Sequence, residues 1–495
     1  MRKIISGRRA SGLGESFNFK INTAITGSTG VGNFRVPVSN TSRFAMFGTS
    51  GWLVDWGDGN PLTSVTYSNY ATSTLHTYTT PGLHNLKIYG SIESWSFRWM
   101  IGQWGDEEKM VEINQWGPFV IKYEGAFRNC SNLNLITCID LPTTGPNAGL
   151  ARLFEGCSSL EAINRIKDWD VSQTTNMSMM FYNNQKLQFG SWPSAGPIDL
   201  SLWDVSNVTT MSQMFSNTVQ FDGKMFNVTS TTTNLVAMFM LALGYNNGNT
   251  GFTIENWDTS GATNMRSMFF GTASFNRDIS GWDTTSVTNM QLMFGNNNNQ
   301  ASIFNAPIGL WNTSNVTDMS GMFYRNDFFD QDLSNWNVNA WVTPPNFTNI
   351  DGSGQGLPLT LSTVNYDALL IAWDAYSFPA WASGTVDFGD SQYTSGGAAA
   401  VARTSLIAKW GAITDGGSIA PPSDRRLKRN INKIGISKEG YNIYTFEFID
   451  TAKYGSGLYQ GVMSDNIPQE FVNIHADGYD RVDYSQLDVE FKKIK

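Results

Sequence analysis

The chain has 495 residues, of which 15% are charged and 47 are glycine, and its formal net charge is −9. This length predicts about three or more domains. The composition excludes a coiled coil or a disordered chain and favours a β-rich, turn-rich surface protein. The negative charge argues against nucleic-acid binding. No apolar run approaches the roughly 18 residues of a membrane span, so no membrane insertion is predicted.

Residues 1–15 are predicted to form a basic N-terminal arm. Arg2, Lys3, Arg8 and Arg9 fall in the first nine residues, none of which is acidic. The pattern favours either a solvated tail or an attachment arm that docks on a partner protein. The stretch has no apolar h-region, so it does not predict a secretory signal.

Residues 16–100 are predicted to form a small β-sandwich. The alternating stretches FNFKI, NFRVPV, WLVDWGDGN and LHTYTTPGLHNLKIYG are separated by turn residues. VDWGDG at residues 54–59 and HTYTTPG at residues 76–82 resemble the PKD-type immunoglobulin-like domain. Residues 56–59 form the tight turn, and for Asp55 and Asp58 structural turn chemistry is favoured over cation binding.

Residues 101–350 repeat one unit, whose clearest copy is WDVSNVTTMSQMF at residues 203–215. A Trp is followed by a Met after eight residues, by a second Met three residues later, and at once by a Phe. The Phe anchors lie 24 to 34 residues apart, and a period in this range predicts a solenoid. The predicted core positions are Trp203, Met211, Met214, Phe215, Trp257, Met265, Met268, Phe269, Trp282, Met290, Met293, Phe294, Trp311, Met319, Met322 and Phe323.

Each segment of the unit has its own predicted structure. The alternating, β-branched V-T-x-M segment predicts a short strand. The M-x-x-M-F segment has apolar residues at i, i+3 and i+4, which predicts an inward-packed turn of helix. The W-D-x-S/T segment predicts a turn in which Asp bonds nearby backbone amides. One unit cannot bury these residues alone, so stacking at about 4.8 Å per strand would build a shared core rather than a cofactor site.

The regular spacing of the Phe anchors continues upstream in a second form of the repeat. Phe127 lies in GAFRNCSNL and Phe154 in RLFEGCSSL. Both forms resemble the BspA-like leucine-rich repeats of bacterial and phage surface proteins. The resemblance implies a right-handed solenoid with a parallel strand ladder, used for adhesion. Cys130 and Cys157 fill one repeat slot, which favours stacked core thiols over a disulfide or a metal pair. The three His show no metal-ligand spacing, so no metal or cofactor is predicted.

Residues 351–422 break the repeat and are predicted to cap it. Apolar residues recur at helical spacing in LSTVNYDALLIAWDAYS and in AAAVARTSLIAKWG, with a strand and turn, VDFGDSQY, between them. The terminal coil of a solenoid must present a polar outer face, which such a segment supplies. The stretch resembles the capping segment that follows these repeats in relatives.

Residues 423–495 carry three ordered motifs, SDRRLKRNI, LYQGVMSDNIPQEFV and VDYSQL. Together they resemble the endosialidase-type intramolecular chaperone domain of phage tail fibres and tailspikes. The resemblance implies a small α+β domain that trimerises, helps its fibre to fold and often cuts itself off immediately before the motif Ser. Ser423 matches the nucleophile of that family, and Lys428 matches the partner base.

Physical chemistry allows this pair to react. A Ser hydroxyl is a weak nucleophile without a base nearby, and Lys becomes a base when burial or cationic neighbours lower its pKa. The competing interpretation is a basic helix start, with Ser423 as N-cap and Asp424 in the first turn. The cationic neighbours of Lys428 in the sequence are Arg425, Arg426 and Arg429.

The leading hypothesis is a phage tail fibre or spike, a virion protein that binds a host surface glycan or protein through its repeats. The chain would form a homotrimer and attach through its N-terminus to other tail or baseplate proteins. Adhesive repeats, a fibre-type chaperone domain and the lack of a secretory signal agree with this hypothesis. No turnover enzyme is predicted, only a single self-cleavage before Ser423.

Two alternatives stay open. A secreted bacterial adhesin would use the same repeats, and a signal peptide missing through a wrong start codon would revive it. A glycan-hydrolysing tailspike would need paired carboxylates roughly 5–10 Å apart. One position of the repeat holds Asp in the earlier repeats and Asn in the later ones. A structural turn tolerates this replacement, whereas a catalytic carboxylate would not. The residues at this position, which we call the acidic ladder, are Asp170, Asp204, Asp258, Asp283, Asn312 and Asn337.

Overall fold

The chain forms two compact units, residues 1–277 and 278–495. The computed structural model describes residues 14–37, 51–65, 74–93, 95, 97, 106–144, 149–187, 198–221, 223–245, 254–296, 302–341, 347, 359–377, 384–395, 397–419, 423–454, 457–474 and 478–494. The predicted attachment arm, residues 1–15, lies outside these ranges except for its last two residues.

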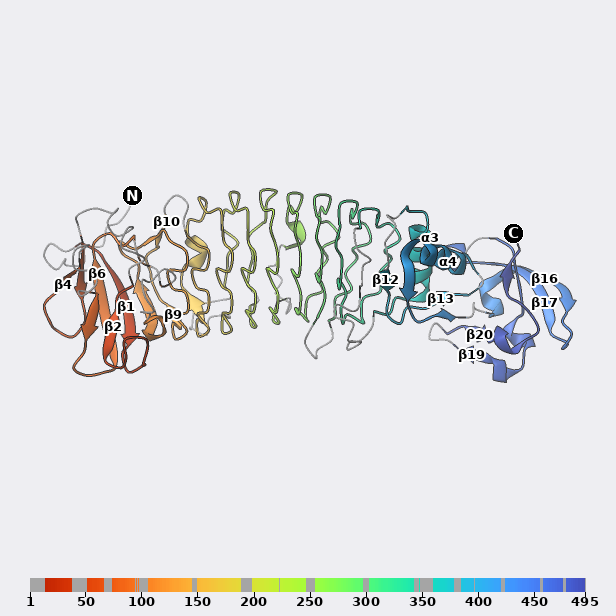
Figure 1. Ribbon diagram of the computed structural model, residues 1–495, viewed down its shortest axis with the longest axis horizontal. Coiled ribbons are helices and arrows are strands. Elements are labelled where there is room, and N and C mark those ends of the chain that lie inside the picture. The colour runs from red at the N-terminus through yellow and green to blue at the C-terminus, as the bar shows by residue number, and fades with distance from the viewer. Residues whose placement is uncertain are drawn as a thin grey trace. The chain divides into compact units, whose positions relative to one another are not determined.

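Within these ranges the protein is mainly β, with two short helices, α3 and α4, and one single helical turn, α5 (Figure 1). The first unit contains β1 (Ser16–Asn22), β2 (Asn33–Arg35), β3 (Trp52–Asp55), β4 (Thr63–Val65), β5 (Leu75–Thr77), β6 (Leu83–Tyr89), β7 (Met110–Gln115), β8 (Val120–Ile121), β9 (Leu135–Ile136), β10 (Thr143–Thr144) and β11 (Ala162–Ile163), with the 3-10 turns η1 (Glu107–Lys109), η2 (Ile166–Asp168) and η3 (Ile254–Asn256).

The second unit contains the helices and the remaining strands. The helices are α3 (Thr363–Trp373), α4 (Ala398–Trp410) and the single turn α5 (Thr451–Tyr454). The strands are β12 (Gly384–Asp387), β13 (Tyr393–Thr394), β14 (Gly411–Thr414), β15 (Ser418–Ile419), β16 (Lys428–Ile436), β17 (Asn442–Phe448), β18 (Tyr459–Gly461), β19 (Val472–Ile474), β20 (Asp480–Val482) and β21 (Lys492–Lys493). The 3-10 turns are η4 (Arg425–Leu427), η5 (Ser464–Asn466), η6 (Gln469–Phe471) and η7 (Tyr484–Gln486).

A mixed seven-stranded sheet lies near the N-terminus, in the order β11-β9-β7-β1-β6-β3-β4. β1 is antiparallel to both of its neighbours, β6 and β7, whereas β7, β9 and β11 run parallel. The predicted sandwich strands therefore share a sheet with the first repeat strands, across the predicted boundary at residue 100. This pairing covers an edge of β1 that a separate sandwich would leave open.

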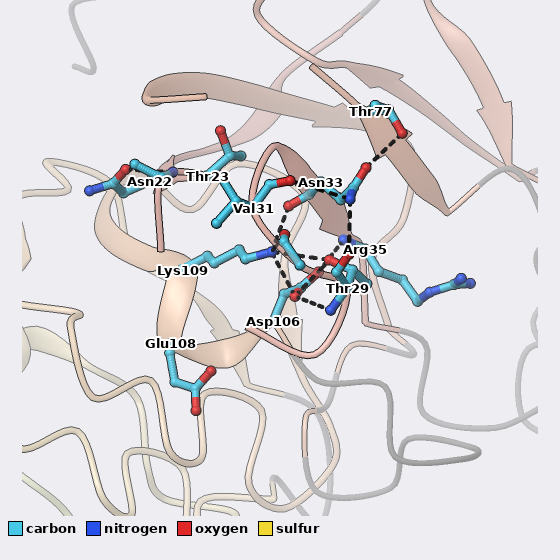
Figure 2. A network of polar contacts seen from close by, with 12 residues as sticks. Asn22, Thr23, Thr29, Val31, Asn33, Arg35, Thr77, Asp106, Glu108 and Lys109 are labelled. Carbon is cyan, nitrogen blue, oxygen red and sulfur yellow. Dashed lines mark hydrogen bonds and ion pairs between the residues drawn. The ribbon is translucent and has the colours of Figure 1, made fainter. Parts of the chain in front are cut away.

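A buried ion pair fastens the loop after β1 to η1 (Figure 2). Asp106 and Lys109 are fully buried, with 3.0 Å between Oδ1 and Nζ. Lys109 Nζ also donates to the carbonyls of Gly30 and Asn33 at 2.8 and 2.7 Å, and Asp106 accepts the amide of Arg35 at 2.8 Å. Buried charges are tolerated when they are paired and hydrogen-bonded, and this pair meets both conditions. We call these residues the Asp106–Lys109 clamp.

The repeats of the first unit follow one another as similar narrow loops (Figure 1). Parallel bridges join Asn176 to Thr210, Thr210 to Asn234, and Asn234 to Asn264. The predicted V-T-x-M strand is thus reduced to one bridging residue in each of these repeats. The core positions of this unit are at most 4% exposed, namely Trp203, Met211, Met214, Phe215, Trp257, Met265, Met268 and Phe269.

A column of near-parallel Phe rings runs through these repeats. Ring centroids are 5.9 Å apart between Phe154 and Phe181 and 5.5 Å apart between Phe181 and Phe215. The next steps, to Phe239 and Phe269, are 5.7 Å each. The Cys slot lies in the same core, where Cys130 and Cys157 are buried free thiols. One aromatic ring in each repeat therefore continues the core of the repeat before it.

The prediction of a helical turn in M-x-x-M-F is wrong. Gln213 has a φ of 57°, which is left-handed. The amides of Gln213 and Phe215 donate to the carbonyls of Val236 and Met238 in the next repeat, at 2.8 and 2.9 Å. An α-helix would direct every amide to a carbonyl of its own segment. Because alternate amides bond the neighbouring repeat instead, pairing between repeats overrides the local helical pattern.

The second unit packs its repeats in the same manner. The indole rings of Trp282 and Trp311 stack with centroids 6.3 Å apart, and Trp311 Nε1 donates to the carbonyl of Ile279 at 3.1 Å. The core positions of this unit are at most 3% exposed, namely Trp282, Met290, Met293, Phe294, Trp311, Met319, Met322 and Phe323.

Helices α3 and α4 occur where the sequence predicts helices in the cap segment. Ser362 caps α3 through its hydroxyl, which accepts the amide of Asn365. Trp373 of α3 and Trp410 of α4 are fully buried. Strands β12 and β14 pair in parallel, as do β13 and β15. None of the helices within the described residues is long and apolar enough to cross a membrane.

Residues 423–494 build a small domain with its own core. Strands β16, β17, β18 and β21 form an antiparallel sheet in that order, and β19 pairs with β20. The only helix of this segment among the described residues is the single turn α5, so the expected α+β composition is mostly β. One apolar cluster comprises Phe446, Phe448, Tyr459, Met463 and Phe491, and a second comprises Val462, Ile467, Val482 and Val489.

Candidate functional site

Ser423 is fully buried where the three motifs of the C-terminal segment meet. Its amide donates to the carbonyl of Asp480, at the start of β20, at 2.9 Å. Its carbonyl accepts the amide of Ser464, in η5, at 3.0 Å. The two backbone bonds fix the residue between segments that are distant in the sequence. The motifs that the sequence shows only as an ordered series thus surround one serine.

The hydroxyl of Ser423 has no hydrogen-bond partner of good geometry among the described residues. It lies close enough to the hydroxyl of Tyr484 to lower the pKa of that phenol, against the larger effect of burial, which raises it. A buried polar group without a partner costs about 1–3 kcal/mol. A chemical role is one explanation for such a group.

Lys428 is also buried, 5% exposed, at the start of β16. Its Nζ donates to the carbonyl of Val462 at 3.2 Å and lies 3.9 Å from the centroid of the Phe446 ring. The pKa of Lys428 is lowered from 10.5 to about 7, mainly by burial and to a smaller extent by Arg425, while Asp424 and Asp465 oppose the shift. Near neutral pH a large fraction of this amine is therefore unprotonated and can accept a proton.

The prediction that three arginines lower this pKa is right in cause but too broad. Burial is the largest cause, and Arg425 is the arginine among its causes. Arg426 instead donates to the carboxylate of Asp424 through Nε at 3.0 Å. Arg429 pairs with Glu447 at 3.2 Å. Arg425 is also paired, with Asp465 at 2.8 Å, so pairing with a carboxylate does not by itself distinguish the arginine that acts on Lys428.

The competing interpretation of a helix start is wrong. Asp424, rather than Ser423, is the N-cap, and its side chain accepts the amide of Arg426 at 2.8 Å. The capped element η4 is a single 3-10 turn of three residues, and the chain then enters strand β16. Ser423 is therefore free of a capping role.

Ser423 and Lys428 are both buried, but they are not hydrogen-bonded to each other. Lys428 bonds the carbonyl of Val462, and Tyr484 Oη accepts the amide of Val462 at 2.9 Å. Val462 therefore separates the lysine from the phenol that adjoins Ser423. Catalytic hydrogen bonds are often long in a resting site and shorten when the reaction begins.

The other predicted polar residues occupy turns. Asp55 accepts the amide of Gly57 at 3.0 Å, and Asp58 pairs with His76 at 2.7 Å. Gly57 has a φ of +75°, and a Cβ there would lie 2.1 Å from the carbonyl oxygen of Asn85. Only glycine fits so close an approach, which agrees with structural turn chemistry at this motif.

The acidic ladder of the repeats also serves turns. Asp204 accepts the amide of Ser206 at 3.0 Å, and Asn312 accepts the amide of Ser314 at 3.1 Å. The same bond is formed by a carboxylate and by an amide oxygen, so the position does not need charge. Among the residues that the structure describes, no group of three or more His, Cys, Asp or Glu is arranged to hold a metal ion.

The sequence reasoning missed Tyr484 and Val462 as parts of this site. Both lie inside recognised motifs, VDYSQL and LYQGVMSDNIPQEFV, which were the available signal. The motifs do not reveal which of their residues face Ser423, because this depends on the packing of β18, β20 and η7. The structure makes this assignment through the bonds around Val462.

Comparison with known families gives one match. Residues 121–252 and 240–348 match, as two overlapping stretches, a family described as Mycoplasma protein of unknown function, DUF285. The matches lie within the repeats predicted at residues 101–350. Neither the curated proteins nor the solved structures contain a match to this chain.

Proposed function

We propose that this protein is a phage virion structural protein, a tail fibre or spike. In this proposal residues 101–350 bind the host cell surface, and residues 423–495 assist the assembly of a homotrimer. The observation that carries the proposal is the pair of buried residues Ser423 and Lys428, where the three motifs meet. A serine hydroxyl with no well-formed hydrogen bond to the described residues and a lysine with a pKa of about 7 suit a self-cleaving maturation domain.

The proposed self-cleavage uses both residues. Ser423 Oγ attacks the carbonyl carbon of residue 422, and its proton passes to Lys428 Nζ. The bond from that carbon to the Ser423 nitrogen breaks, and the nitrogen takes the proton from Lys428. Water then hydrolyses the ester on Ser423 Oγ, which leaves a carboxylate at residue 422 and a free amine on Ser423. The bond from the Ser423 amide to Asp480 holds the leaving nitrogen in place.

We further propose that the repeats form a right-handed leucine-rich-repeat solenoid. The parallel bridges and the column of Phe rings support this geometry. Exposed residues of successive repeats form columns as well. The hydroxyl of Thr233 donates to the carbonyl of Thr209, and that of Thr263 donates to the carbonyl of Thr233. A surface that repeats in this way suits several weak contacts to a glycan or protein of the host, which together bind strongly.

The alternatives are less well supported. A secreted bacterial adhesin would use the same repeats, yet it has no evident need for a buried Ser and Lys. A glycan-hydrolysing tailspike needs paired carboxylates with room for a sugar, whereas Asp204 and its equivalents hold turn amides. The basic N-terminal arm, in the proposed role, attaches the fibre to other tail or baseplate proteins.

Mass spectrometry of the full chain tests the self-cleavage. We expect a fragment that begins at Ser423, and we expect Ser423→Ala and Lys428→Ala to leave the chain intact. Lys433→Ala is the matched control, because Lys433 lies on the same strand but is exposed. The cleavage rate should rise with pH through about 7 and then level off, because only the neutral amine accepts a proton.

Light scattering tests the trimer separately. The full chain should have three times the mass of one chain, and removal of residues 423–495 from the gene should give monomers or aggregates. A monomer at all concentrations would contradict the fibre proposal. An intact chain in mature particles would contradict self-cleavage alone.

A further inference from the structure

Tyr484 combines a fixed ring with a hydroxyl directed at the serine site. The ring packs against both apolar clusters of the C-terminal domain, and its centroid lies 5.8 Å from that of Phe491. Its hydroxyl oxygen accepts the amide of Val462 at 2.9 Å. Packing thus sets the position of the ring, and the amide sets the position of the oxygen.

The backbone of β18 leaves room for this oxygen. A Cβ at Gly461 would lie 2.5 Å from Tyr484 Oη, closer than real Cβ atoms approach any neighbour. Gly461 therefore permits the phenol to reach Val462 and Ser423.

We propose that Tyr484 is a positioning residue for self-cleavage, whose hydroxyl donates to Ser423 Oγ and orients it for attack on the peptide bond that precedes Ser423. This inference rests on the proposed self-cleavage and adds a third residue to it. The phenol oxygen already accepts from Val462, so its own proton is available for a donated hydrogen bond. When the Tyr484 hydroxyl donates to a lone pair of Ser423 Oγ, the serine O–H stays free to donate its proton to Lys428.

The protonation of Tyr484 agrees with a donor role. Burial raises the pKa of the phenol, so the group keeps its proton at neutral pH. A neutral phenol can donate to Ser423, whereas a phenolate could only accept. The donated bond is not yet well formed in the resting site, since the Ser423 hydroxyl has no partner of good geometry. We therefore expect it to form as the serine turns toward the carbonyl carbon.

The test follows the cleavage of newly made full-length chain in a cell-free synthesis, with a pulse of labelled methionine and timed samples. Tyr484→Phe keeps the ring and removes the hydroxyl, and we expect it to slow cleavage about 100-fold, a typical effect of misplacing a reacting group. 4-Aminophenylalanine at the same position restores a donor of similar size, and we expect it to restore the rate to within about three-fold. Thermal melting of each variant in a Ser423→Ala chain checks that the domain is folded.

The outcomes are distinct. If the unaltered chain cleaves and Tyr484→Phe cleaves equally fast, Tyr484 is only a packing residue and this inference is overturned. If Tyr484→Phe is slow and 4-aminophenylalanine does not rescue it although folded, the donor role is likewise overturned. If Tyr484→Phe fails to fold, the folded 4-aminophenylalanine chain is compared with the unaltered chain. A rate within about three-fold supports the donor role, and a much slower rate overturns it. If the unaltered chain never cleaves, the proposed self-cleavage fails and this inference fails with it.

Discussion

Two buried lysines, in different regions of the molecule, are treated in opposite ways. Lys109 faces the buried carboxylate of Asp106 at 3.0 Å and donates to two carbonyls. Lys428 makes no ion pair with any of the described residues, and its Nζ bonds the carbonyl of Val462 over the ring of Phe446. A buried charge that is fully paired holds structure, whereas a buried amine without a paired carboxylate is driven toward its neutral, reactive form.

Lys109→Met should give the largest loss of stability. It leaves the carboxylate of Asp106 buried without a counter-charge, which typically costs about 3–5 kcal/mol. Lys428→Met is the matched variant, and it should cost much less or even stabilise, because it removes an amine that burial already disfavours. Chemical denaturation of both variants in the Ser423→Ala chain measures the difference. Equal losses in the free energy of unfolding for the two variants would contradict the proposed difference between the two lysines.

Emptying a repeat core site should cost nearly as much as breaking the clamp. Met265 is fully buried and Phe269 is 2% exposed in the column of rings. Met265→Ala and Phe269→Ala should each cost about 2–5 kcal/mol, through lost burial and the cavity left behind. Melting temperatures that change by less than about a degree would contradict the placement of these residues in the core of the first unit.

A pH effect should separate the two lysines more finely. The pKa of Lys428 is about 7 in the folded chain and 10.5 in an exposed lysine. Between these values the unfolded chain binds more protons, so the free energy of unfolding should rise with pH from about 7 to about 10.5. Denaturation of Ser423→Ala at several pH values measures this slope, and Lys428→Met in the same background should remove it. An unchanged slope would assign the effect to other groups.

The smallest effect is expected in the repeat turns. Asp204→Asn keeps an acceptor for the amide of Ser206, as Asn312 does for Ser314. It should change stability by less than about 0.5 kcal/mol, as surface substitutions usually do. Asp204→Ala removes the acceptor and should cost more. A large loss on Asp204→Asn would show that the carboxylate charge matters, unlike the turn role inferred here.

Much of the candidate site was predictable from the sequence, but its geometry was not. Ser423 and Lys428 were recognisable because they stand at fixed positions in the motif SDRRLKRNI. Tyr484 was not, because a motif gives the order of residues and not the direction of their side chains. The low pKa of Lys428 was expected partly from arginines, but burial has the larger effect.

The sequence by itself determined where the repeats lie, which of their residues are apolar, and that two helices follow them. These features depend on local spacing and composition, which can be read directly from the sequence. Only the tertiary structure decided that M-x-x-M-F would not be helical, because its alternate amides bond the next repeat. Only it brought Ser423, Val462 and Tyr484 together. Contacts between distant segments are set by packing, and packing depends on the whole fold rather than on any stretch of sequence.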